Sequence, residues 1–137
     1  MAGHGFISES IRIPAGRERD LISETITIPD VLLQAHTAPL GLAFYTAGQF
    51  PAEYRGDTFI AMHGSWNREK RVGYKIVRLR MQNGRPTGIV EDFLTGFVIN
   101  ETSVWGRPVG VAVAKDGALL VSEDGSNTIW RISWKGL

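Results

Sequence analysis

The sequence contains no cysteine among its 137 residues. Disulfides, thiolate metal sites and cysteine nucleophiles are therefore excluded, and the redox compartment stays open because a cysteine-free protein tolerates either environment. No apolar run approaches the roughly 18 residues of a membrane helix, so we expect no membrane partner. The N-terminus, Met1-Ala-Gly-His-Gly5, lacks the charged and apolar regions of a signal peptide, and the sequence as it stands shows no export signal.

Side-chain metal sites and common catalytic motifs are also missing. His36 and His63 are far apart, with no third ligand at metal-binding spacing, so we expect no zinc site. Asp116 and Asp124 lie in turn sequences that do not resemble a calcium loop. The segment Gly64-Ser65-Trp66 lacks the Gly-x-Ser-x-Gly elbow of many hydrolases. No phosphate loop or dinucleotide fingerprint is present, so nothing supports a bound nucleotide.

Acidic residues are nearly absent between Arg68 and Arg85, where Glu69 stands against seven basic side chains. A concentrated positive field suits an anionic ligand. A solvated edge strand rich in lysine and arginine, which resists aggregation, gives the same pattern, and both interpretations stay open. A nucleic-acid role would rest on this stretch alone, with Trp66 and Tyr74 as stacking candidates, and we do not expect that partner.

What is present favours β structure. Sixteen glycines and four tryptophans accompany many valine, isoleucine and threonine residues. Asn83-Gly84, Asp116-Gly117 and Asp124-Gly125 are typical hairpin turns between short apolar strands. Since no segment has a convincing helical period, the chain is predicted to be all-β. The predicted strands cover residues 42–45, 58–62, 73–81, 88–94, 109–113, 118–121 and 128–134.

The first 29 residues contain a short internal repeat. Ile7-Ser-Glu-Ser-Ile-Arg-Ile-Pro14 returns as Ile22-Ser-Glu-Thr-Ile-Thr-Ile-Pro29, with six of eight positions identical. The alternation of isoleucine with polar residues in the second copy is typical of a half-buried strand. We therefore predict a β-hairpin or a pair of edge strands over residues 1–29.

The strand count predicts the architecture of residues 30–137. Residues 40–95 hold about four strands, which is the content of one propeller blade, and residues 108–134 hold three more. The N-terminal hairpin could supply the missing outer strand. The predicted fold is a β-propeller fragment of about two four-stranded antiparallel blades. Two blades cannot close a ring, and their exposed apolar faces and edges predict oligomerisation.

Three segments place polar side chains beside glycine and proline at the ends of predicted strands: 36–45, 63–68 and 105–113. In a propeller, such loops gather at one end of the central channel, where ligands bind. Arginine can clamp a planar polycarboxylate, tryptophan offers a stacking face, and histidine can contact a quinone oxygen or transfer a proton. The tryptophans and histidines could instead pack and bridge loop backbones, and spacing alone does not decide.

Several uncommon motifs follow one another along the chain. They are His36-Thr-Ala-Pro-Leu-Gly41, Gly56-Asp-Thr-Phe-Ile-Ala-Met-His-Gly-Ser-Trp-Asn-Arg68, Asp92-Phe-Leu-Thr-Gly96, Trp105-Gly-Arg-Pro-Val-Gly-Val-Ala-Val113 and Leu119-Leu-Val-Ser-Glu-Asp-Gly-Ser-Asn-Thr-Ile-Trp-Arg-Ile132. In this order they resemble the C-terminal part of sorbosone dehydrogenase-like proteins, which belong to the glucose/sorbosone dehydrogenase family of soluble quinoproteins. The resemblance implies a six-bladed β-propeller, often periplasmic, that binds pyrroloquinoline quinone (PQQ) with calcium and oxidises sugars or aldehydes.

The resemblance also implies where a cofactor binds. His36, His63, Asn67, Arg68 and Arg107 fall on cofactor-facing loops, with Arg107 as the partner of a cofactor carboxylate. The family's catalytic base and calcium-binding backbone lie in N-terminal blades without a counterpart here, so no catalytic residue is assigned. Residues 1–29 do not resemble the family sequence that precedes this region.

Two outcomes follow for the function. Three copies of a two-bladed chain could assemble one six-bladed ring that acts as a sugar or aldehyde dehydrogenase. Alternatively, the chain is a truncated or recombined relic that serves as a non-catalytic oligomeric β-propeller module binding a small anionic ligand or a sugar.

Overall fold

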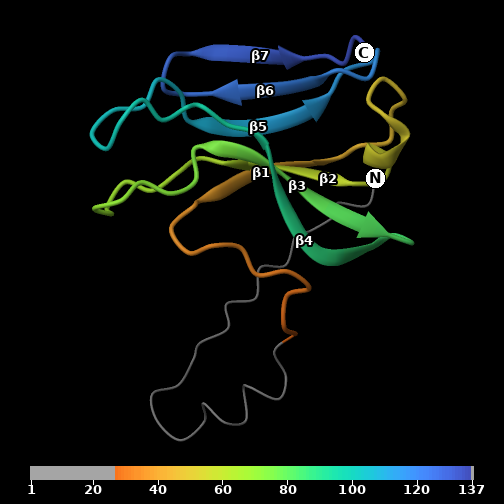
Figure 1. The fold of residues 1–137 in the computed structure, drawn as a ribbon, viewed down its shortest axis with the longest axis horizontal. Coiled ribbons are helices and arrows are strands. Elements are labelled where there is room, and N and C mark those ends of the chain that lie inside the picture. Colours follow the sequence, from red (N-terminus) through yellow and green to blue (C-terminus); the bar gives the residue numbers. More distant parts are fainter. Residues whose placement is uncertain (1–26, 137) are drawn as a thin grey trace, which may run out of the picture.

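The computed structural model describes residues 27–136. Apart from residues 27–29, the predicted N-terminal hairpin lies outside this range. Seven strands form two antiparallel sheets that lie one above the other (Figure 1), with strand orders β1-β2-β3-β4 and β5-β6-β7. The strands are β1 (Pro39–Phe44), β2 (Thr58–Met62), β3 (Lys75–Gln82), β4 (Arg85–Leu94), β5 (Pro108–Val113), β6 (Leu119–Glu123) and β7 (Thr128–Ile132).

The all-β prediction is confirmed, and all three predicted hairpin turns join neighbouring strands. The helical structure in residues 27–136 is one short 3-10 turn, η1 (Ala52–Tyr54). The described part of the chain therefore contains no helix that could cross a membrane. At the Asn83-Gly84 turn both residues have positive φ, 52° and 75°, as a tight two-residue hairpin requires.

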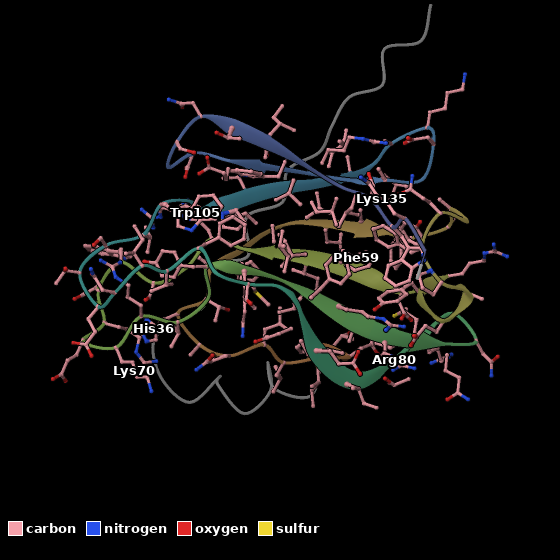
Figure 2. The ribbon with its side chains drawn as sticks, turned by 45° about the horizontal axis from the view of Figure 1, so that its top comes forward. His36, Phe59, Lys70, Arg80, Trp105 and Lys135 are labelled. Carbon is pink, nitrogen blue, oxygen red and sulfur yellow. The ribbon has the colours of Figure 1, made fainter. Side chains whose placement is uncertain are left out.

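The two sheets enclose an aromatic core, and Figure 2 shows Phe59 between them. Tyr45 is fully buried, accepts a hydrogen bond from the Phe50 backbone N–H (2.9 Å) and donates one to the Gly117 carbonyl (2.8 Å). Because its hydroxyl ties the first sheet to the hairpin of the second, it fixes their separation. The cluster comprises Tyr45, Phe50, Phe59, Ala61, Ile76, Leu119 and Val121.

Strands β1 and β5 approach each other closely where the two sheets meet. A Cβ at Gly41 would lie 2.5 Å from the Val109 carbonyl oxygen and 2.9 Å from the Gly110 Cα. No side chain fits between these backbones, so glycine is required for this contact. The two sheets therefore pack through their first strands.

The part of the basic stretch that forms β3 is neither an edge strand nor a free positive patch. Strand β3 lies between β2 and β4, and its charges have partners on β4 and in the segment that precedes β2. Arg80 pairs with Glu91 (3.2 Å), and Lys75 pairs with Asp92 (2.6 Å). These carboxylates neutralise much of the field that an anionic ligand would need.

Arg78 carries the most buried of these charges. Its side chain is 4% exposed, and its Nε lies 2.5 Å from the Asp57 carboxylate, which is 3% exposed. The Tyr54 ring covers the guanidinium, with its centroid 3.8 Å from the Arg78 Cζ. Burial lowers the pKa of Arg78, but the hydrogen bonds and charges of Asp57 and Glu53 together outweigh burial and raise it. Asp57 also accepts the Met81 N–H (2.8 Å).

The substitution Asp57→Asn is expected to destabilise the fold by about 3 kcal/mol, because removing one partner leaves a buried charge uncompensated. Urea denaturation measures this change. Glu91→Gln is the matched control, since Glu91 pairs with the same arginine but is 41% exposed, and it should cost about 1 kcal/mol or less. Equal losses for the two variants would contradict the assignment of Asp57 as the main partner.

Candidate functional site

Four loops meet at one end of the two sheets, because antiparallel strands alternate in direction (Figure 1). They are residues 36–38, 63–74, 95–107 and 124–127. All five candidate residues from the sequence lie in these loops. Figure 2 shows His36, Lys70 and Trp105 towards this end and Arg80 and Lys135 towards the other.

The loop before β1 is bound to the loop after β2 by backbone hydrogen bonds. The His63 N–H donates to the Ala38 carbonyl (3.0 Å), and the Gly64 N–H donates to the Thr37 carbonyl (2.9 Å). His36 and Ala38 have φ of 68° and 48°, a region that non-glycine residues seldom occupy. Such strain clusters at ligand sites. The His36 side chain is exposed.

A histidine–carboxylate pair joins the two sheets. His63 Nε2 lies 3.0 Å and 3.1 Å from the two carboxylate oxygens of Asp124. The His63 side chain is 17% exposed and that of Asp124 is 59% exposed. Since Asp124 binds Nε2, the second ring nitrogen of His63 remains for a ligand, as an acceptor in the neutral ring or a donor in the protonated one.

Arg107 contacts the His63–Asp124 pair through the backbone of Asp124. Its carbonyl accepts the Asp124 N–H (3.2 Å), and its guanidinium carbon lies 5.8 Å from the centroid of the Tyr74 ring. Its Nε is buried and has no hydrogen-bond partner among residues 27–136. An unpaired buried donor costs about 1–3 kcal/mol, so this N–H calls for an explanation such as a ligand acceptor.

Glu123 holds the turn that carries Asp124. Its side chain is 4% exposed and accepts the backbone N–H groups of Arg107 (3.1 Å) and Gly125 (2.8 Å). It also accepts the N–H and hydroxyl of Ser126 and the N–H of Thr128. Burial raises the pKa of Glu123, but these hydrogen bonds outweigh burial and lower it.

Arg71 ties the 63–74 loop to the 95–107 loop. Its Nε and one terminal nitrogen donate to the carbonyls of Glu101 (2.8 Å) and Thr102 (2.7 Å). The other terminal nitrogen donates to the Tyr74 hydroxyl (3.0 Å). The sequence identified Arg71 only as part of the basic stretch, because its acceptors are backbone carbonyls that leave no residue signature.

The remaining candidates lie at the same end without direct contacts to this chain of residues. Asn67 and Arg68 are exposed in the 63–74 loop, and the described residues give neither side chain a hydrogen bond or ion pair. Trp66 beside them is 87% exposed. Trp105 instead packs, stacking on Phe97 with ring centroids 4.7 Å apart.

The structure thus brings together His63 and Arg107, through Asp124, and leaves His36, Asn67 and Arg68 on the surface around them. Sequence reasoning did not assign Asp124, Glu123 or Arg71 to this site, and it considered Tyr74 only as a stacking residue for nucleic acid. Within residues 27–136, no group of three or more histidine and acidic side chains is placed to hold a metal ion.

Comparison with known proteins identifies the family. A family model described as TrAA12-like matches residues 14–135. The chain belongs to the TrAA12-like family. Among curated relatives, an uncharacterized protein of Borreliella burgdorferi is 43% identical over 110 residues, which cover 79% of this chain and 29% of that protein. A pyrroloquinoline quinone-dependent pyranose dehydrogenase of Coprinopsis cinerea is 34% identical over 122 residues, covering 76% of this chain and 16% of the relative.

Two solved structures share this fold. An iodide structure of the Trichoderma reesei carbohydrate-active enzyme family AA12 matches with a TM-score of 0.67 at 28% identity. The match covers 84% of this chain and 29% of the Trichoderma reesei chain. The holo form of the Coprinopsis cinerea pyranose dehydrogenase PQQ domain has a TM-score of 0.67 at 29% identity, covering 88% and 32%. The TrAA12-like chain thus spans about a third or less of these relatives. The predicted all-β fold of two antiparallel sheets and the kinship with PQQ-dependent quinoproteins are confirmed. The second sheet has three strands in the described residues, where four were predicted.

In this TrAA12-like chain, Arg71→Ala should loosen both loops that Arg71 connects. Hydrogen exchange is expected to speed up at least several-fold across residues 66–70 and 98–104 while the strands keep their protection. Lys70→Ala, which changes the exposed neighbouring residue, is the control and should leave both loops unchanged. Unaltered exchange in the 98–104 segment of the Arg71 variant would contradict this role.

The lowered pKa of Glu123 predicts that the folded TrAA12-like chain loses stability in acid. Because its folded pKa lies below the ordinary 4.5, the unfolded state binds more protons in this window. The stabilisation is present above that value and is lost as pH falls through the folded pKa. Glu123→Gln should cost about 2 kcal/mol at pH 7, and the difference from wild type should shrink towards pH 3.

Urea midpoints at several pH values measure this effect. Glu101→Gln, an exposed carboxyl on the adjacent loop, is the control and should follow the wild-type curve. A Glu123→Gln deficit that stays constant from pH 7 to pH 3 would show that packing, and not charge, accounts for the loss.

Proposed function

We propose that this chain forms the carboxylate-binding part of a PQQ-dependent sugar dehydrogenase site. The observation that carries the proposal is the buried, unpartnered Nε of Arg107 beside the His63–Asp124 pair. A charged donor without an acceptor in the described chain is what a cofactor carboxylate would satisfy. The relationship to a PQQ-dependent pyranose dehydrogenase supplies the chemical class.

The residues present fit a planar, anionic quinone. Bound PQQ would supply the two-electron oxidising capacity that the oxidation of a sugar requires. Arg107 holds a carboxylate with its guanidinium fork. His63, oriented by Asp124, hydrogen-bonds the cofactor or the substrate through its second ring nitrogen. His36, Asn67 and Arg68 contact the outer edge of the bound molecules from the surrounding loops.

The substrate in this proposal is a sugar or a sugar aldehyde, sorbosone among the latter. No residue of this chain is assigned as the catalytic base, and the calcium that accompanies the cofactor is proposed to bind outside these loops. We therefore expect the isolated chain to bind PQQ without turning over a sugar. Binding without turnover is also what a non-catalytic module for anionic ligands would show.

The test is a fluorescence titration of the protein with PQQ in calcium-containing buffer. Arg107→Ala should weaken binding by roughly 10–100-fold, since a hydrogen bond to a charged group contributes about 1.5–3 kcal/mol and each 1.4 kcal/mol is tenfold. Arg107→Lys should fall between the two, because it keeps the charge and loses the fork.

Arg85→Ala is the matched control, because Arg85 is exposed and begins β4 at the opposite end of the sheets. It should bind like the wild type. An equal loss of PQQ affinity in the Arg85 and Arg107 variants would show that only net charge matters. The proposal is overturned if the wild-type chain does not bind PQQ saturably.

A further inference from the structure

The two sheets are copies of one pattern. Strand β1 reads Pro39-Leu-Gly-Leu-Ala-Phe44, and β5 reads Pro108-Val-Gly-Val-Ala-Val113. Each strand has a register irregularity between its proline and its glycine. Pairing continues in step, since Leu42 faces Ile60 as Val111 faces Val121. Residue n of β1 therefore corresponds to residue n+69 of β5.

Because the two sheets repeat one pattern, we can ask which side of the pattern each sheet presents to the other; the two present opposite sides, so the contact is head-to-tail. The Gly41 and Ala43 side of β1 faces the second sheet, since the missing Cβ of Gly41 points at Val109 and Gly110. On β5, Val111 and Val113 pack into the core between the sheets. The two sheets thus use opposite sides of the repeated pattern to make one contact.

Within residues 27–136, each sheet leaves the complementary side uncovered. Leu40, Leu42 and Phe44 of β1, which correspond to Val109, Val111 and Val113, are 58%, 56% and 57% exposed. On the second sheet, Ala112, which corresponds to Ala43, is exposed, and Ile129 on the same side of β7 is 71% exposed. A large apolar face that stays bare is a mark of an interaction site.

The uncovered part of the first sheet lies at β1. Val31 and Leu33 pack over Ile60, Met62, Val77 and Leu79 and so cover the middle strands of this face. Among the described residues, this segment borders β1 but leaves its apolar side chains exposed. A partner would therefore meet β1, as β1 meets β5 within the chain.

We propose that the occupant is a second copy of this chain, whose Gly110 and Ala112 side docks on Leu40, Leu42 and Phe44. The contact is heterologous, so it repeats until a ring closes. The ring places the 124–127 turn of one copy beside the 63–74 loop of the next.

Sedimentation of the full 137-residue chain without cofactor tests the assembly, and its outcome is independent of PQQ binding. The expected species is a closed oligomer with a multiple of the 15.1 kDa of one chain. Leu42→Asp should shift it to monomer with an unchanged circular dichroism spectrum, because the side chain is exposed. A monomer at all concentrations would overturn the proposal.

The absence of cysteine allows a test of the contact itself. Mixing separately purified Leu42→Cys and Ala112→Cys chains under oxidation should give a disulfide-linked heterodimer. Gln82→Cys, exposed at the far end of β3, should not cross-link with Ala112→Cys. Selective homodimers of Leu42→Cys would show a two-fold interface and contradict the head-to-tail arrangement.

Discussion

The close approach of β1 to β5 is the contact on which the rest of the structure depends. Because Gly41 has no side chain, the backbones meet where a Cβ would be 2.5 Å from the Val109 oxygen. At this separation Tyr45 reaches the Gly117 carbonyl and the aromatic core closes between the sheets. The loop after β2 then comes within hydrogen-bond distance of the turn after β6, where His63 meets Asp124. The site geometry therefore follows from a packing constraint.

An arginine is available to a ligand only where no carboxylate or carbonyl of the fold already accepts its side-chain N–H groups. Asp57 satisfies Arg78, and backbone carbonyls satisfy Arg71, so both guanidinium groups serve the fold. Glu123 takes the backbone N–H of Arg107 and leaves its side-chain Nε without an acceptor in the described residues. Arg78 and Arg71 thus stabilise the fold, whereas Arg107 is a candidate binding group at the loop end.

Local signals in the sequence predicted the strands well. The Asn-Gly and Asp-Gly turns identified the three tight hairpins, although β1 starts at Pro39 and β4 at Arg85, earlier than the apolar pattern indicated. Pairings between distant residues could not be predicted in this way. Asp124 was interpreted as a turn residue, and its bond to His63 spans 61 positions, so only the packing of the two sheets reveals it. The edge-strand interpretation of the basic stretch was wrong for β3 for the same reason, because its acidic partners are distant in the sequence.

A crystal structure of this chain grown with PQQ and calcium tests the central claim most directly. The account predicts a cofactor carboxylate oxygen within hydrogen-bond distance of Arg107 Nε, with the His63–Asp124 pair intact beside it. Cofactor bound elsewhere on the chain, or an Arg107 Nε that bonds to its own backbone in the complex, would contradict the account.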